Sequence, residues 1–409
     1  MKGRCREKLH ERIEEVEVQK KLKIAMLGHK RVPSREGGVE IVVEELSVRM
    51  TARGHRVTCY NRSGHHISGA EFDSTDAGKE YKGVRLKTVP SVRTKGVSAV
   101  VSSFFGSVFA AAAHYDVVHI HAEGPAAFCW IPKMLGKKVV VTVHGLDWKR
   151  EKWQGGFGSK YIHFGEKMAV KWADEIIVLS EGLQAYFMNT YGRETRFIPN
   201  GVSKPEAAEI REIDKKFGLK KEEYILYLGR IVPEKGGHYL IEAWREIRSS
   251  KKLVIAGGTS DTDEYVMRLK KLAEGDERII FTGFVQGRLL EELYSNSYLF
   301  VLPSDLEGMP LSLLEAMSYG NCCLVSDIDE CSHVIGDAGI VFKKADVKDL
   351  RDKLQSCIDE PEKVKRYKEG AAGYICRKYD WKEVMEETFE VYRSEYAKKG
   401  NFKFEKGYR

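Results

Sequence analysis

The chain has few of the residues that mark disulfide-rich, fibrous or disordered proteins. Only 10 prolines and 8 cysteines occur among its 409 residues. The cysteines form no CxxC pair and no dense framework, so we expect reduced, mostly buried thiols in a cytosolic protein. Charged residues make up 31% of the chain and hydrophobic residues 43%. This balance argues against disorder, and the length is sufficient for two full cores.

Long hydrophobic runs are also absent. The most apolar segment, residues 98–113, is shorter than the ~20 residues that a helix needs to cross a bilayer. Ser102, Ser103 and Ser107 interrupt it without adding a cationic face, which favours a buried or interfacial helix over one that lies on a membrane. The first 20 residues alternate in charge and lack the apolar centre of a signal peptide, so we expect a cytoplasmic protein.

Neither sign of charge dominates. The 67 basic residues exceed the 60 acidic ones by a formal net charge of +7, without a long Lys/Arg block. This small excess favours anionic partners and does not indicate a nucleic-acid-binding protein. The charge pattern of residues 1–20 fits a solvated helix or a contact with a partner, and does not distinguish them.

Short β-rich runs alternate with amphipathic segments along most of the chain, which predicts parallel sheets wrapped by helices. We predict a charged extension at 1–20, an N-terminal Rossmann-like domain at 21–205, a C-terminal Rossmann-like domain at 206–378, and a crossover helix and tail at 379–409. The expected strands are LKIAMLGH, RVTCYNR, VRLKTVP, DVVHIHA, KVVVTVHG and EIIVLS in the first domain, and YILYLGR, KKLVIAGG, RIIFTGF, YLFVLPS and CCLVSD in the second.

The residues between the two series of predicted strands, and those after the second series, explain these boundaries. Asn200-Gly201 predicts a turn, and the residues after it are polar until the next apolar run, which places the boundary near residue 205. Apolar residues from Trp381 to Tyr392 recur along one helical face with no strand after them. A terminal helix packed across the seam between the domains fits this pattern.

The second domain is richest in residues that suit chemistry. Open α/β sheets bind ligands beyond the carboxyl ends of their strands. Arg230 and Lys235 follow one predicted strand and suit a diphosphate. Pro310 is well placed to open a helix whose free N–H groups can hold phosphate oxygens. Carboxylates cannot favour phosphate, so Glu307 and Glu315 are expected to accept hydrogen bonds from sugar hydroxyls.

Metal binding is not indicated. His119 and His121 share one strand face, but two ligands without a third are weak support for a metal, and we interpret both as structural. Two segments read DxD, at residues 261–263 and 327–329, and helix capping is the stronger interpretation of the first. Because Arg230 and Lys235 already supply positive charge, we expect no metal and no cofactor.

Several segments together resemble family 4 of the retaining glycosyltransferases, which have the GT-B fold, and particularly its bacterial surface-polysaccharide members. The match covers nearly everything from residue 22 to 395. The segments that carry the resemblance are GHKRVPSREGGVE at 28–40, TVHGLDWKREKW at 142–153, GRIVPEKG at 229–236 and EGMPLSLLE at 307–315.

The resemblance implies a role for residues on both sides of a cleft between the domains. Arg230 and Lys235 bind the donor diphosphate, Glu315 binds the ribose hydroxyls, and Glu307 binds the transferred sugar. His144 faces the reacting sugar from the first domain and helps to orient the reacting centre. The other donor-site residues that it implies are Gly37 and Gly38, whose backbone approaches the pyrophosphate, Phe284 at the base, and Gly308, Met309, Pro310 and Leu311 along the path of the sugar.

The implied reaction is hexosyl transfer with retention from a nucleotide sugar, such as a UDP- or GDP-sugar, to a saccharide or a polyprenyl-diphosphate-linked acceptor. It would serve polysaccharide or glycoconjugate biosynthesis in the cytoplasm or at the inner face of the membrane. The alternatives are a nucleotide-sugar epimerase or hydrolase of the same fold and a non-catalytic nucleotide-sugar-binding protein.

Acceptor binding is expected in the first domain. The candidates are Arg35, Glu36, Glu123, Trp148, Arg150 and Trp153. The loop from residue 148 to 153 is basic and carries two tryptophans, which fits contact with a lipid-linked diphosphate at a membrane face or a cover over the cleft. The sequence does not choose between them.

Overall fold

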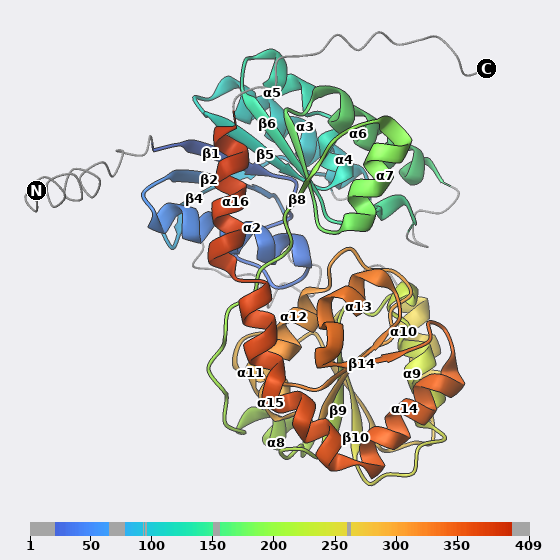
Figure 1. The fold of residues 1–409 in the computed structure, drawn as a ribbon. Coiled ribbons are helices and arrows are strands. Elements are labelled where there is room, and N and C mark those ends of the chain that lie inside the picture. The colour runs from blue at the N-terminus through green and yellow to red at the C-terminus, as the bar shows by residue number, and fades with distance from the viewer. Residues whose placement is uncertain are drawn as a thin grey trace, which may run out of the picture.

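The computed structural model describes residues 21–64, 78–92, 94, 96–149, 156–259 and 263–394. The predicted extension at 1–20 and the last part of the predicted tail, residues 395–409, lie outside these ranges. The described chain forms two α/β domains, each built on its own largely parallel sheet (Figure 1). The predicted doubly wound architecture is therefore confirmed.

The first sheet has the strand order β3-β4-β2-β1-β5-β6-β7-β8 and is parallel except for the β3–β4 pair. Its central strands are apolar runs buried on both faces, as in β6, because helices cover both sides. The strands are β1 (Lys23–Leu27), β2 (Arg56–Arg62), β3 (Glu80–Tyr81), β4 (Val84–Val89), β5 (Val117–His121), β6 (Lys138–Val143), β7 (Glu175–Val178) and β8 (Arg196–Phe197).

Helices cover this sheet in two layers. One face packs against α2 (Gly38–Ala52) and α16 (Trp381–Arg393). The other face packs against the layer formed by α3 (Val97–Ala112), α4 (Glu123–Ala126), α5 (Trp130–Met134), α6 (Phe157–Trp172) and α7 (Glu181–Tyr191).

The second sheet has the order β11-β10-β9-β12-β13-β14, and all its pairs are parallel. The sequence did not predict β3 or β14, because edge strands of two and three residues have too few positions to show a period. The strands are β9 (Tyr224–Leu228), β10 (Lys252–Ala256), β11 (Ile279–Gly283), β12 (Leu299–Leu302), β13 (Cys323–Ser326) and β14 (Ile340–Phe342). The helices are α8 (Glu212–Phe217), α9 (Gly237–Trp244), α10 (Asp263–Leu272), α11 (Gly287–Asn296), α12 (Leu311–Ser318), α13 (Asp329–Ile335), α14 (Val347–Asp359) and α15 (Pro361–Lys378).

The chain passes between the domains twice, and the two crossings touch. The backbone N–H of Val202 donates to the carbonyl of Tyr379 over 2.7 Å. Gly201 lies against the ring of Trp381, where an added Cβ would come within 2.5 Å of a ring carbon. The predicted boundary at residues 205 and 206 falls between β8 and α8, just after the first crossing.

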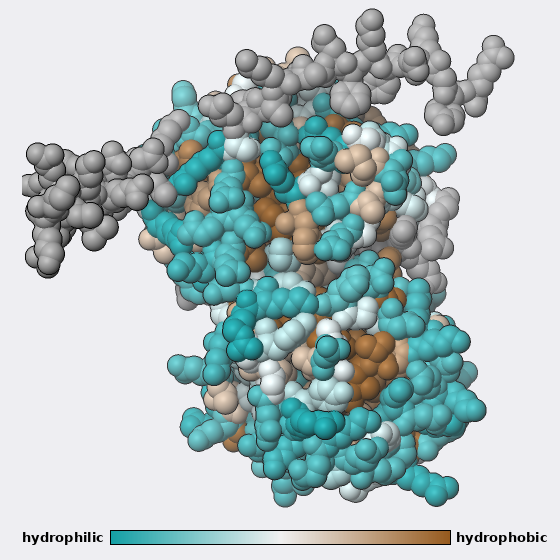
Figure 2. Space-filling model, viewed as in Figure 1, coloured by the Kyte–Doolittle hydropathy of each residue, from teal (hydrophilic) through white to brown (hydrophobic). Residues whose placement is uncertain are grey.

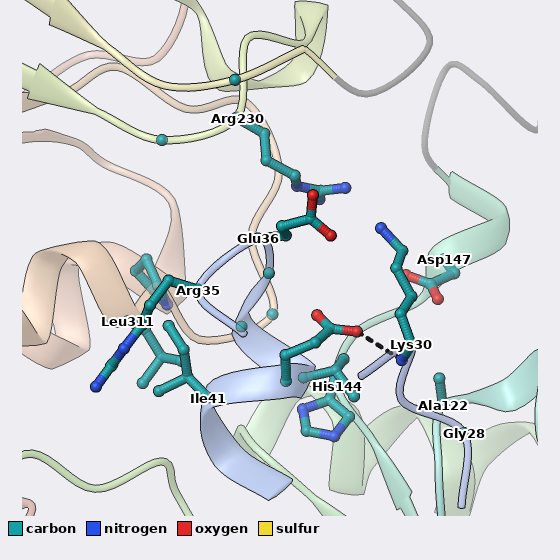
Figure 3. A pocket seen from close by; sticks show the side chains of 18 of the residues that line it. Gly28, Lys30, Arg35, Glu36, Ile41, Ala122, His144, Asp147, Arg230 and Leu311 are labelled. Atoms are coloured by element: carbon teal, nitrogen blue, oxygen red, sulfur yellow. Dashed lines mark hydrogen bonds between the residues drawn. The ribbon is translucent and has the colours of Figure 1, made fainter. Parts of the chain in front are cut away.

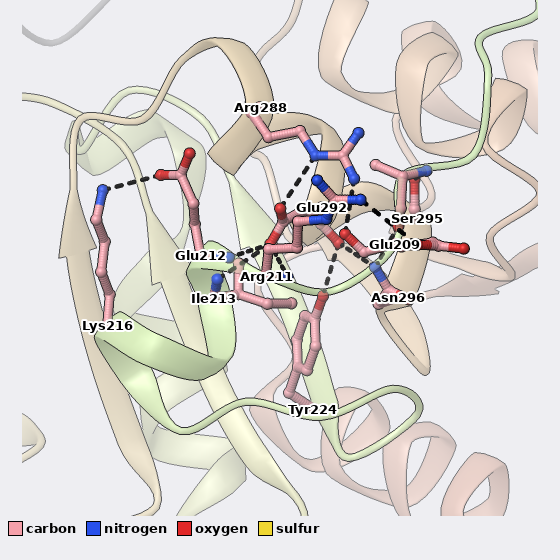
Figure 4. A network of polar contacts seen from close by, with 11 residues as sticks. Glu209, Arg211, Glu212, Ile213, Lys216, Tyr224, Arg288, Glu292, Ser295 and Asn296 are labelled. Carbon is pink, nitrogen blue, oxygen red and sulfur yellow. Dashed lines mark hydrogen bonds and ion pairs between the residues drawn. The ribbon is translucent and has the colours of Figure 1, made fainter.

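Glu292 binds the segment that follows the first crossing to the second domain (Figure 4). Its Oε2 accepts the backbone N–H groups of Arg211, Glu212 and Ile213 at 2.8–3.1 Å, and its Oε1 accepts Arg288 Nε at 3.1 Å. The side chain is fully buried, so these bonds replace its hydration. The start of α8 is therefore a fixed part of the second domain.

Helix α16 returns the chain to the first domain (Figure 1). Its Tyr392 hydroxyl lies 2.7 Å from His119 Nδ1 inside that domain, and Arg53 and Glu386 form an ion pair at the surface. The predicted crossover helix is confirmed. The side of the molecule that carries α16 is mostly hydrophilic (Figure 2).

Candidate active site

A cavity of about 640 Å³ lies between the domains and is lined by both. This volume is in the range of sites for small molecules and cofactors. Figure 3 shows side chains from the two domains converging on it. The loops that follow β1 and β6 form part of one wall, and those that follow β9 and β12 form part of the other. The site therefore lies where parallel sheets bind ligands, at the carboxyl ends of their strands.

Lys235 and Glu307 of the second domain meet in the cavity wall. Lys235 Nζ donates to Glu307 Oε1 over 2.5 Å, and Ser304 Oγ donates to the same oxygen over 2.7 Å. The turn that directly follows Lys235 depends on Gly236, whose φ is +66° and whose added Cβ would lie 1.9 Å from the Pro303 carbonyl oxygen. Local backbone packing thus brings together Lys235, which is predicted to bind the diphosphate, and Glu307, which is predicted to bind the transferred sugar.

The start of α12 forms the next part of this wall. Pro310 caps the helix, and its carbonyl accepts the N–H groups of Leu313 and Leu314. Met309, Pro310 and Leu311 line the cavity, as does Phe284 after β11. The positive end of the helix dipole is therefore available to an anion in the cavity.

Glu315 lies one turn into α12 and also lines the cavity. Its Oε2 accepts the Tyr294 hydroxyl at 3.1 Å, and Arg35 of the first domain approaches its Oε1 to 3.7 Å. Burial raises the pKa of Glu315, and the charge of Arg35 offsets part of the shift. Arg35 thus lines the cavity and lies beside Glu315, the residue predicted to bind the ribose, while its predicted contact with the acceptor stays a prediction.

The domains touch backbone to backbone at Gly308. An added Cβ at Gly308 would lie 1.6 Å from the carbonyl oxygen of His144, and an added Cβ at Gly145 would lie 3.2 Å from Gly308 Cα. Asn200 reinforces the contact, because its Nδ2 donates to the Met309 carbonyl over 3.2 Å. The sequence singled out Gly308 but did not indicate this contact.

His144 lines the cavity and is held from behind by buried histidines. His121 Nδ1 lies 3.0 Å from His144 Nε2, and the rings of His119 and His121 are 4.1 Å apart. His119 also contacts Thr142 Oγ1 over 2.7 Å. Burial lowers the pKa of His119 to about 3 and that of His121 well below its ordinary value, so both rings are neutral. His121 therefore orients His144 through a hydrogen bond, and His119 packs against the ring of His121.

The first domain contributes two cations that sequence reasoning missed. Lys30 follows β1, Arg62 ends the neighbouring strand β2, and both line the cavity. The backbone N–H of Lys30 donates to Glu40 Oε1 over 2.9 Å (Figure 3). Burial lowers the pKa of both cations, while Glu40 opposes the shift. Their positions at adjacent strand ends were the signal that could have identified them.

Gly37 and Gly38 lie at the start of α2 and line the cavity. An added Cβ at Gly38 would lie 3.4 Å from Leu311 Cδ1 of the other domain, so this loop reaches across the cleft. Glu36 also lines the cavity, and its carboxylate faces the guanidinium of Arg230 (Figure 3).

Glu123 and Trp148, the other acceptor candidates that the structure describes, do not line the cavity. Glu123 is fully buried, and its Oε2 accepts the N–H of Asp147 over 3.0 Å. Burial, with the nearby acids, raises its pKa well above the ordinary value. The prediction that Glu123 binds an acceptor directly is therefore wrong. Trp148 stacks on His163 with ring centroids 4.5 Å apart, while Arg150 and Trp153 lie outside the described residues.

No group of three or more histidine, cysteine or acidic side chains that could hold a metal occurs in the described part of the chain. Asp327 Oδ1 accepts the N–H of Lys344 over 2.8 Å, and Asp329 begins α13. Asp261 lies outside the described ranges. The six described cysteines from Cys59 to Cys357 are buried and free.

Comparison with known proteins identifies the class. Two domains around a shared cavity are the GT-B glycosyltransferase architecture, and Anabaena HepE, solved in complex with UDP and glucose, has the same fold. Its TM-score is 0.75 at 16% identity, over 90% of this chain and 99% of that one. Residues 36–204 match the model of Glycosyltransferase Family 4, and residues 209–374 match that of Glycosyl transferases group 1. The chain belongs to these group 1, or family 4, glycosyltransferases.

Two relatives support the same family. An uncharacterized glycosyltransferase of Methanocaldococcus jannaschii is 25% identical over 91% of this chain and 98% of its own length. The alpha-D-kanosaminyltransferase of Streptomyces kanamyceticus is 27% identical over 68% of this chain and 76% of its own length. The predicted family and GT-B fold are confirmed.

Proposed function

We propose that the protein transfers a hexosyl group from a nucleoside-diphosphate sugar to an acceptor hydroxyl with retained anomeric configuration. The observation that carries the proposal is the composition of one cavity. Arg230, Lys235 and the start of α12 supply positive charge on one wall, Glu315 lies one helical turn further, and His144 faces them from the other domain. The UDP in the HepE structure makes a uridine nucleotide the first donor to test.

In the proposed reaction the bond between the sugar and the diphosphate breaks, and its electron pair leaves with the phosphate oxygen. Arg230, Lys235 and the α12 amides stabilise that oxygen. The acceptor hydroxyl attacks from the same face of the sugar, and its proton passes to the departing phosphate oxygen. Glu307 and His144 hold the sugar hydroxyls during transfer. No metal or other cofactor takes part.

The setting we propose is polysaccharide or glycoconjugate biosynthesis in the cytoplasm. In the described part of the chain, no helix is long and apolar enough to cross a membrane. Access to a membrane-bound acceptor would therefore have to come from a surface of the protein.

The experiment is a thermal-shift and transfer screen against UDP-, GDP-, dTDP- and ADP-sugars, with and without chelator. A folded-state ligand raises the melting temperature. We expect one nucleotide to stabilise the protein in chelator, and Lys235→Met to abolish this effect. Lys270→Met, on the exposed side of α10, is the matched control. Stabilisation only with divalent metal would contradict the proposal that no metal takes part. Release of free sugar without acceptor would indicate a hydrolase. A product with inverted anomeric configuration would contradict the retaining mechanism.

A further inference from the structure

Helix α3 exposes two of its three phenylalanines, Phe104 and Phe109, while Phe105 packs against the core of the first domain. The residues that it buries are small: Ser102, Ser103, Gly106, Ser107, Ala110 and Ala111. Ser102 and Ser103 are satisfied within the helix, because both hydroxyls donate to the Ala99 carbonyl. Phe104 and Phe109 remain 40% and 42% exposed. A helix of a water-facing surface shows the opposite arrangement. The three serines therefore do not count against contact with an apolar phase, contrary to the expectation from sequence.

Helix α6 supplies the cationic face that α3 lacks. Its exposed residues recur every three or four positions and are all aromatic or basic: Phe157, Lys160, Phe164, Lys167 and Lys171. Phe157 is 84% exposed. Helix α4 contacts both α3 and α6, and Met134 and Leu135 at the end of α5 are exposed in the same helical layer. We call the outward side of α3, α5 and α6 the Phe–Lys face.

The charge of the Phe–Lys face selects its partner. Helices α3 to α6 contain two acids, Glu123 and Glu166, and both are fully buried. Among the large apolar residues exposed in the described chain, Met267 alone lies in the second domain. Exposed aromatic groups beside unopposed lysines suit the interface of a bilayer with anionic lipids. A symmetric contact with a second copy would instead bring lysines against lysines.

The Phe–Lys face adjoins the mouth of the active-site cavity. Val97 and Val100 of α3 and Phe157 and Tyr161 of α6 line the cavity, while residues further along the same helices form the face. A surface that rests on this face would deliver its molecules to the first-domain side of the cleft.

We propose that the Phe–Lys face docks on membranes that contain anionic lipids, and that the acceptor is a lipid-linked saccharide presented from that membrane. The docking stands on the surface alone, whereas the acceptor class rests on the proposed glycosyltransferase function.

The test of docking is cosedimentation of the full chain with vesicles of phosphatidylcholine alone or with 30% phosphatidylglycerol. We expect binding to the anionic vesicles that weakens at high salt. The triple variant Phe164→Ser/Lys167→Glu/Lys171→Glu should lower the partition coefficient on the order of 100-fold or more, given the contribution of each charge near the surface. None of these residues lines the cavity, so stabilisation by the donor nucleotide should be unchanged.

The matched control is Met267→Ser/Lys270→Glu/Lys271→Glu on α10, which makes the same charge change at exposed positions of the second domain. Equal losses in the two triple variants would refute a specific face. So would failure of the wild type to bind anionic vesicles, or a dimer in sedimentation velocity that only the α6 variant dissolves.

The acceptor class is tested with a radiolabelled form of the nucleotide sugar that stabilises the protein and membranes from its source organism. We expect label in the organic-solvent extract. Label confined to water-soluble saccharides would overturn the lipid-linked acceptor, whereas no transfer at all, with vesicle binding intact, would count against the proposed enzyme and leave the docking supported.

Discussion

Replacement of Gly308 by alanine should separate the two domains at their point of backbone contact. The new Cβ would lie 1.6 Å from the carbonyl oxygen of His144, whereas real Cβ contacts are essentially never shorter than 3.0 Å. The obstacle is backbone, so it cannot rotate away, and one domain must shift by about 1.4 Å. A misplacement of about 1 Å at a reacting centre can cost on the order of 100-fold in rate. We therefore expect Gly308→Ala to lower kcat/KM by about 100-fold.

The assay combines steady-state transfer with thermal melting and small-angle X-ray scattering. One cluster of buried hydrophobic residues lies wholly within each domain and should be unaffected, so the melting temperature without ligand should change little, while the nucleotide-dependent shift should decrease. Gly370→Ala is the control, because nothing lies within 4 Å of its added Cβ in α15. Alanine there should be neutral or slightly stabilising. Activity of Gly308→Ala within twofold of the wild type would show that this contact is not part of the reacting state.

Three further predictions concern the walls of the cavity. Lys235→Met leaves the carboxylate of Glu307 buried without its cation and should lower the free energy of unfolding, measured in urea, by about 3–5 kcal/mol. Adding Glu307→Gln should restore most of this stability but not the activity. Equal stability of the single and double variants would contradict this prediction. Burial raises the pKa of Glu315, so its ionisation opposes folding. The wild type should therefore lose stability relative to Glu315→Gln as pH rises through that pKa. A difference in melting temperature between the two proteins that stays constant from pH 4 to 8 would refute this prediction. His121→Phe removes the hydrogen bond that orients His144 and should lower kcat about 10- to 100-fold. His121→Asn, which keeps a donor near the Nδ1 position, should retain most activity. An equal loss of activity in both variants would show that His121 acts through packing alone.

The second-domain wall was predictable because its chemistry is local in sequence. Arg230 and Lys235 follow one strand within a few residues, and residues 307–315 form one turn and the helix after it. A strand that ends in a turn before a helix places its side chains at the same sheet edge in any doubly wound domain. Arg230, Lys235 and residues 307–312 and 315 line the cavity.

The first-domain wall was harder to predict from the sequence, because position at a strand end does not determine whether a side chain faces the cleft. Glu123 follows β5 but begins α4 and is buried, where an added Cβ on Gly165 would lie 2.0 Å from its carbonyl oxygen. Lys30 and Arg62 received no weight in the sequence, although they line the cavity. The serines of α3 lie on its buried side, which composition alone could not show because it does not reveal which side of a helix faces water.

By itself the sequence determined the two wound domains, the crossover helix and the residues of the second-domain wall, because hydrophobic period and turn chemistry act over a few residues. Only the tertiary structure decided which residues meet across the cleft. The approach of Gly308 to His144 and of Arg35 to Glu315 joins residues more than 150 positions apart. Such contacts depend on the relative orientation of the two domains, which the touching crossings at Val202 and Tyr379 and the contacts across the cleft hold, and which no local pattern contains.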